Sequence, residues 1–114
     1  MSDNKELYIL WTNADLITSE KMVFMYSING MIHNWWKEVT IVIWGATAKL
    51  AAENELIQEK IKQALHVGIK IIACKGCSDQ LNVSEKLESL GVEVIYWGVG
   101  LTDVLQDDKK LLTV

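Results

Sequence analysis

Two cysteines close together give this chain its clearest chemical signal. They are Cys74 and Cys77 in the sequence Cys74-Lys75-Gly76-Cys77, and the 114-residue chain contains no others. Residues 69–73 before them are mostly apolar, as in a buried strand, and a helix is expected to follow. Lys75 and the start of that helix favour a thiolate, whereas Asp79 opposes it. This arrangement predicts a site for nucleophilic or redox chemistry of sulfur.

Three interpretations of the cysteine pair remain open. A Cys-x-x-Cys motif in an α/β protein suggests a thioredoxin-like dithiol or redox switch. The motif follows the third predicted strand, however, and the chain has no proline to form a cis-proline loop. The second interpretation is that the two cysteines are small packing residues at a strand end, because free cysteine is often buried. The third interpretation is a nucleophilic thiol with a second thiol that resolves its product.

Apolar runs separated by helical patterns define the fold class. Strands are predicted at residues 7–11, 39–44, 69–74, 92–97 and 110–114. Helices are predicted at residues 18–33, 46–67 with an interruption near Asn54, 79–90 and 101–105, with a loop at 98–100. Gly68 and Gly91 are expected to end helices. The alternation predicts a three-layer α/β/α sandwich with a mostly parallel five-stranded sheet, as a single domain over residues 1–114.

Several candidate binding residues fall where the predicted strands end. The carboxyl ends of parallel strands meet at one edge of a sheet, where α/β folds build their sites. Trp11, Trp44 and Trp97 would join Cys74 there, either as walls of a cleft or as caps of the core. The candidate binding residues at this edge are Asn13, Trp44, Gly45, Ser78 and Trp97.

The two histidines are expected at the opposite edge of the sheet. His33 and His66 end predicted helices, which run back toward the amino ends of the strands. A six-residue strand at ~3.3 Å per residue separates them from the cysteines by roughly 20 Å. The sequence therefore predicts neither a zinc site nor a Cys–His pair, and no cofactor.

Composition narrows the classes of function. The formal net charge is −4 and no basic stripe is present, which argues against nucleic acid binding. No segment approaches the ~20 apolar residues needed to cross a membrane. The polar start of the chain leads directly into a strand without a signal-peptide pattern, so a cytoplasmic protein with reduced thiols is expected.

The first predicted helix is apolar around most of its circumference. Residues 22–26 are apolar for more than a turn, and apolar residues continue to Trp36. One face of this helix suffices to cover the sheet, so the remaining apolar face is expected to make a second buried contact. Either the carboxyl-terminal segment covers it or a second subunit does. We expect a homo-oligomer with Met22, Met25 or Tyr26 near the contact.

Parts of the sequence resemble the DsrE/DsrF-like family of small sulfur-relay proteins. The similar segments are residues 43–46, 72–83, 87–94, 101–105 and 110–114. The resemblance implies trimers or hexamers, a sulfur-relay protein partner, and the strand order 4-3-2-1-5; a flavodoxin-like 2-1-3-4-5 order is the alternative.

The resemblance also implies a role for each cysteine. Cys74 matches the position that accepts sulfane sulfur in sulfur carriers of the family, whereas many of these carriers lack Cys77. The basic segment that often follows the cysteine is replaced by Ser78-Asp79-Gln80-Leu81. The implied function is a persulfide carrier or sulfurtransferase in which Cys77 resolves the persulfide and Ser78 stabilises the anion. The alternatives are a non-catalytic oligomeric binding module and a dithiol redox switch.

Overall fold

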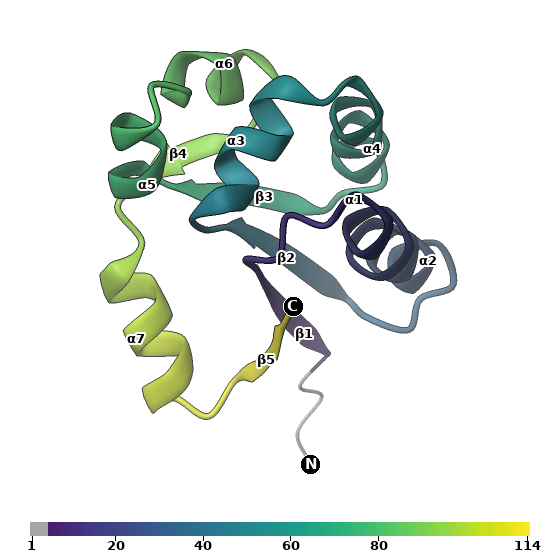
Figure 1. Ribbon diagram of the computed structural model, residues 1–114. Coiled ribbons are helices and arrows are strands. Elements are labelled where there is room, and N and C mark those ends of the chain that lie inside the picture. Colours follow the sequence, from purple (N-terminus) through teal and green to yellow (C-terminus); the bar gives the residue numbers. More distant parts are fainter. Residues whose placement is uncertain (1–4) are drawn as a thin grey trace.

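The computed structural model describes residues 5–114, which contain a five-stranded sheet (Figure 1). Its strands are β1 (Glu6–Trp11), β2 (Glu38–Ile43), β3 (Lys70–Cys74), β4 (Glu93–Ile95) and β5 (Lys110–Thr113). All neighbouring strands are parallel, and their order is β4-β3-β2-β1-β5. The predicted fold class and the strand order implied by the resemblance are both confirmed.

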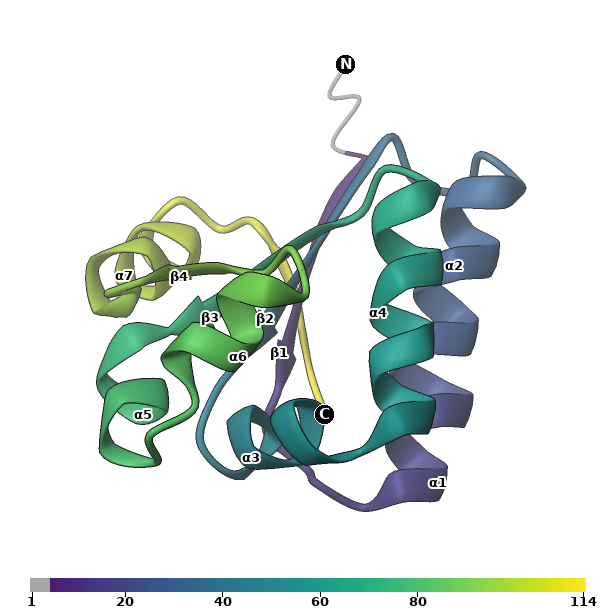
Figure 2. The same cartoon turned by 90° about the horizontal axis from the view of Figure 1, so that it is seen from above.

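Helices cover the two faces of the sheet unequally. They are α1 (Leu16–Thr18), the π-helical segment η1 (Ser19–Phe24), α2 (Met25–Ile32), α3 (Ala46–Glu53), α4 (Glu55–His66), α5 (Lys75–Gln80), α6 (Ser84–Ser89) and α7 (Gly98–Gln106). Figure 2 shows α2 and α4 on one side of the sheet and α7 on the other. We call these sides the α4 face and the α7 face. None of these helices is long and apolar enough to cross a membrane.

The two faces carry separate apolar cores because strand side chains alternate between them. On β1, Ile9 and Trp11 pack on the α4 face with residues such as Phe24 and Ile61. On the α7 face a smaller cluster contains Val42, Ile72, Trp97 and Val104. The α7 face therefore has one covering helix and a smaller core, which leaves part of the sheet accessible.

Two predicted helix boundaries are confirmed. Asn54 has an extended backbone, ends α3 and caps α4, with its side chain accepting a hydrogen bond from Ile57 N at 3.0 Å. Gly68 has a φ of +96° and ends α4, as expected of a glycine just past a helix. The first helix begins earlier than predicted, because Asp15 caps it at Leu16 through Thr18 N.

Two other boundary predictions are wrong. The single helix predicted over residues 79–90 is two helices, α5 and α6, separated at Asn82, whose φ is +58°. The loop predicted over residues 98–100 is instead the first turn of α7. Leu101 N donates to Trp97 O at 2.9 Å there, and the indole of Trp97 occupies the space that a side chain at Gly100 would need.

Candidate functional site

The two thiols lie where β3 leads directly into α5. Cys74 is the last residue of β3 and precedes the first residue of α5, while Cys77 lies in the first turn of that helix. Both are free thiols. Cys74 is 9% exposed and Cys77 is half-buried. A strand that passes into a helix without a loop thus holds both sulfur atoms at the carboxyl edge of the sheet.

The two side chains interact with each other. Burial is the main cause that raises the pKa of the Cys77 thiol above its ordinary value, and a hydrogen bond and charge interaction with Cys74 raise it further. An interaction that raises the pKa of an acid favours its protonated form.

Gly45 brings a backbone donor to the same place. It follows β2 with a φ of +73° and a ψ of −128°, and it precedes α3. Its N–H donates to Cys77 and acts to lower the pKa of that thiol. A Cβ at Gly45 would meet nothing within 4 Å, so the space beside this glycine is open. The unusual backbone conformation, not crowding, is the reason for glycine at this position.

Thr47 fixes the segment that holds Gly45. Its side chain is fully buried, and its hydroxyl donates to Trp11 O at 2.7 Å and accepts from Trp44 N at 3.2 Å. These bonds join the ends of β1 and β2 to the first turn of α3. Sequence reasoning did not identify Thr47, although a hydroxyl residue two positions after a strand-ending glycine is a detectable signal for such a bond.

Lys75 and Asp79 pair with each other rather than acting on the thiols. Lys75 Nζ lies 3.0 Å from Asp79 Oδ2, and its hydrogen bond to Asp79 raises the pKa of the lysine. Hydrogen bonds from Ser84 and then Lys75 lower the pKa of Asp79. Because the positive charge of Lys75 and the negative charge of Asp79 neutralise each other, their opposing effects on the thiolate largely cancel.

Of the two alternatives for the tryptophans, caps of the core rather than walls of a cleft, the first describes Trp11 and Trp97. Trp11 is fully buried on the α4 face, edge-on to Phe24, with its Nε1 donating to Ser19 Oγ at 3.0 Å. Trp97 packs on the α7 face against Tyr8, with ring centroids 5.9 Å apart. The two indoles lie on opposite faces of the sheet, so they cap the two cores.

Trp44 is the tryptophan that stays beside the thiols. Ile43 pairs with Ala73 across β2 and β3, so the next residues along these strands are Trp44 and Cys74. Side chains alternate along a strand, and Ile43 and Ala73 belong to the core of the α4 face, so Trp44 and Cys74 point toward the α7 face. Trp44 is half-buried against the core of that face.

Two further predicted binding residues have structural partners elsewhere. The Asn13 side chain accepts a hydrogen bond from Asp15 N at 2.9 Å and shapes the turn after β1. Ser78 is fully buried, and its hydroxyl lies 2.6 Å from Ser84 Oγ and donates to Lys75 O at 3.3 Å. It joins α5 to α6, which corrects the expectation that it serves the thiols. Of the predicted residues, Trp44 and Gly45 are the ones brought to the cysteine pair.

The histidines lie at the other edge of the sheet, as predicted. His33 follows α2 and stacks on Trp35, while His66 ends α4 just before β3 begins. Neither is near a cysteine of its own chain, because the length of β3 separates them. Within residues 5–114 no group of three or more histidine, cysteine, aspartate or glutamate side chains is placed to hold a metal ion.

Comparison with known proteins places this geometry in a wider group. No family model and no curated protein matches the chain. The structure of BT1422, a conserved protein of unknown function from Bacteroides thetaiotaomicron, has 38% sequence identity and a TM-score of 0.97, covering 100% of this chain and 98% of that one. The structure of the ychN protein from E. coli has 16% identity and a TM-score of 0.72, covering 96% and 98%. The chain therefore belongs to the same protein family as BT1422, and it has the DsrE-like α/β fold of ychN.

Proposed function

We propose that the Cys74–Cys77 pair carries sulfur as a persulfide in the cytoplasm. The observation that supports this most directly is the position of two free thiols together where β3 passes into α5, at the carboxyl edge of the sheet. Cys74 is the nucleophile in this proposal, because it ends β3 at the position that matches the sulfur-accepting cysteine of the family it resembles, and Cys77 is the second thiol.

The loading step transfers one sulfur atom from a persulfide donor. The Cys74 thiolate attacks the outer sulfur of a donor R–S–SH, and a new S–S bond forms to Cys74. The S–S bond of the donor breaks, and R–S⁻ leaves with the electron pair and then takes up a proton from solvent. The product is a persulfide on Cys74, with no net oxidation of donor plus protein.

Release proceeds by one of two thiol reactions. A thiolate of a sulfur-relay partner that attacks the outer sulfur restores Cys74 directly. Attack by the Cys77 thiolate on the Cys74 sulfur instead expels HS⁻ and leaves a Cys74–Cys77 disulfide. A thiol reductant must then supply two electrons to restore both thiols.

Mass spectrometry of the intact protein tests the assignment of the two cysteines. After incubation with a low-molecular-weight persulfide, the wild-type protein should gain the mass of one sulfur atom. Cys74→Ser should gain none. Cys77→Ser should retain the added sulfur for longer, because no neighbouring thiol can displace it. The double variant is the control for non-specific addition.

An unmodified wild-type protein with an intact fold would contradict the persulfide proposal. Formation of the Cys74–Cys77 disulfide by oxidants alone, without sulfur addition, would favour a redox switch. If neither reaction occurs, the cysteines are packing residues and a non-catalytic binding module is the better account.

We also propose that copies of this chain associate through η1 and α2. Met22, Met25 and Ile32 on this segment, and Trp35 just after α2, are between 37% and 56% exposed. The carboxyl-terminal helix α7 lies on the other side of the sheet (Figure 2), so it does not cover them. Tyr26 is partly buried against the core, and its hydroxyl accepts from Trp36 Nε1 at 3.0 Å.

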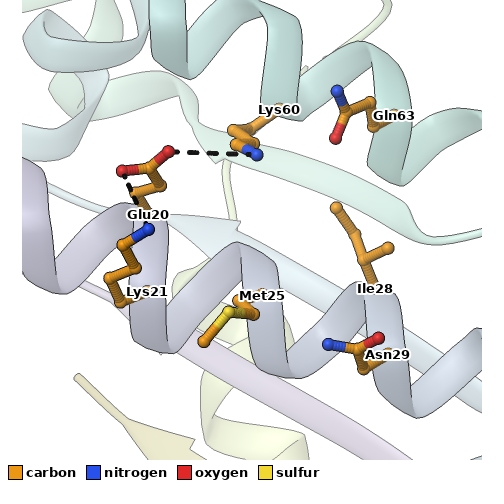
Figure 3. A pocket seen from close by; sticks show the side chains of 7 residues that line it. All are labelled: Glu20, Lys21, Met25, Ile28, Asn29, Lys60 and Gln63. Atoms are coloured by element: carbon orange, nitrogen blue, oxygen red, sulfur yellow. Dashed lines mark ion pairs between the residues drawn. The ribbon is translucent and has the colours of Figure 1, made fainter.

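The same helices border a shallow hollow that adds surface for such a contact. Figure 3 shows Met25 and Ile28 on one side and Lys60 and Gln63 of α4 on the other. An ion pair between Glu20 and Lys60, at 3.9 Å, spans one end of the hollow. A trimer or a multiple of it is the assembly we propose.

A further inference from the structure

A small cavity lies on the α7 face at the amino-terminal ends of the strands, at the opposite edge from the thiols. Its volume is about 160 Å³, and it extends over β1, β2 and β3 beneath Trp97. No motif in the sequence marks it. The helix α7 leaves this part of the sheet uncovered, which is why a cavity remains there.

Strand register determines which side chains meet in the cavity. Tyr8, Thr40 and Lys70 are paired across β1, β2 and β3, so they form one row on the α7 face. The row nearer the amino edge carries Glu6 and Glu38, which are also direct partners. On the other side Ile72 follows, and Trp97 packs against it. The cavity therefore changes from acidic at its mouth to apolar at its inner end.

One of the two carboxylates is already engaged. Glu6 accepts a hydrogen bond from the Tyr8 hydroxyl at 3.0 Å and lies 3.5 Å from Lys109 Nζ. Burial, followed by the interactions with Glu6 and then Glu38, raises the pKa of Tyr8 to about 12. The phenol therefore remains a hydrogen-bond donor at neutral pH, directed at Glu6.

Three other polar groups line the cavity without a side-chain partner among residues 5–114: the exposed Glu38 and Lys70, and the mostly buried Thr40. Within residues 5–114, neither Glu38 nor Lys70 forms an ion pair. Thr40 is 5% exposed and lines the cavity, and its hydroxyl makes no hydrogen bond within the same residues. No fully buried side-chain oxygen or nitrogen within these residues lacks a hydrogen-bond partner, so the Thr40 hydroxyl is open to the cavity and available to a ligand there.

We propose that this cavity binds an α-amino acid with a small apolar side chain. Its ammonium group would pair with Glu38, and its carboxylate would accept hydrogen bonds from Lys70 and the Thr40 hydroxyl. Its side chain would lie against Ile72 and Trp97. A simple amine or a simple carboxylic acid would satisfy only one of the two charged groups, so a zwitterion is the matching ligand.

NMR titration with L-leucine tests the ligand class. The indole N–H resonance of Trp97, assigned with Trp97→Phe, should shift as leucine is added. The control ligands are 3-methylbutylamine and 4-methylpentanoate, which lack the carboxylate and the ammonium group respectively. Each should bind at least about tenfold more weakly than leucine, because it leaves one charged group of the cavity unpaired.

Substitutions test the residues. Glu38→Gln, Lys70→Met and Thr40→Val should each weaken leucine binding. Glu53→Gln and Lys49→Met, on the exposed surface of α3, are matched controls that should not. The Cys74→Ser/Cys77→Ser double variant should bind normally, which separates this proposal from the persulfide proposal. The spectrum of each variant shows whether its fold is intact.

Either of two results would overturn the amino-acid site. One is the absence of any shift with leucine, valine or alanine at millimolar concentration. The other is equal affinity of the wild-type protein, Glu38→Gln and Lys70→Met for leucine.

Discussion

Gly45 is the residue that connects backbone geometry to the thiols. Its φ of +73° with a ψ of −128° is accessible to glycine and strained for other residues. Gly45→Ala should therefore lower the free energy of unfolding by about 1–3 kcal/mol. It should also raise the pKa of Cys77, because relaxation of the backbone moves away the N–H that lowers it. Urea unfolding measures the first effect, and the pH dependence of alkylation in a Cys74→Ser background measures the second.

Gly98→Ala is the matched control for that substitution. A Cβ at Gly98 would also meet nothing within 4 Å, but this glycine lies in the first turn of α7 without a positive φ. Its replacement should leave stability and Cys77 alkylation almost unchanged. If both variants lost equal stability, backbone strain at Gly45 would not be the cause.

Cys77 should also make stability depend on pH. Its pKa in the folded protein is raised above the ordinary value of 9.0, so the unfolded chain loses this proton first as the pH rises. The stabilisation is therefore complete below the ordinary pKa and is lost as the pH rises through the folded pKa. Urea midpoints measured from about neutral pH to about pH 10 should fall more for the wild-type protein than for Cys77→Ser. Parallel curves would exclude this linkage.

At the scale of elements, the break between α3 and α4 depends on one side chain. Asn54 Oδ1 accepts from Ile57 N and satisfies a donor at the start of α4. Asn54→Ala should cost about 1 kcal/mol of stability in urea unfolding. Asn54→Asp should retain most of it, because a carboxylate accepts the same bond and is favoured at a helix amino terminus. Equal losses in both variants would show that the cap itself contributes little.

At the scale of the whole molecule, the exposed apolar surface of η1 and α2 predicts self-association. Met25 is 51% exposed at the start of α2. Met25→Glu would place a charge in the proposed subunit contact, so light scattering should show a lower mass than for the wild-type protein. Leu105→Glu, on the 57% exposed position of α7, is a control that should leave the mass unchanged. A monomeric wild-type protein at micromolar concentration would disprove the association.

Local sequence patterns were sufficient to locate the strands and several of the helix ends. Apolar runs located all five strands, and Asn54 marked the boundary between α3 and α4. These features are local, because they depend on side-chain periodicity and capping within a few residues. The placement of Cys74 at a strand end, and of both histidines at the other edge, followed from the same local pattern together with parallel topology.

Only the tertiary structure decided which side chains meet. Trp11 ends β1, whereas Trp97 lies beyond the end of β4 and caps α7, and the two lie on opposite faces of the sheet. The break at Asn82 accompanies the bond between Ser78 and Ser84 that joins α5 to α6. The cavity near Thr40 requires β1, β2 and β3 in register and an α7 that leaves their amino ends uncovered. Alternation within a strand shows which residues share a face. Which strands become neighbours and which helix covers them depend on contacts between distant segments, and a single sequence does not display those contacts.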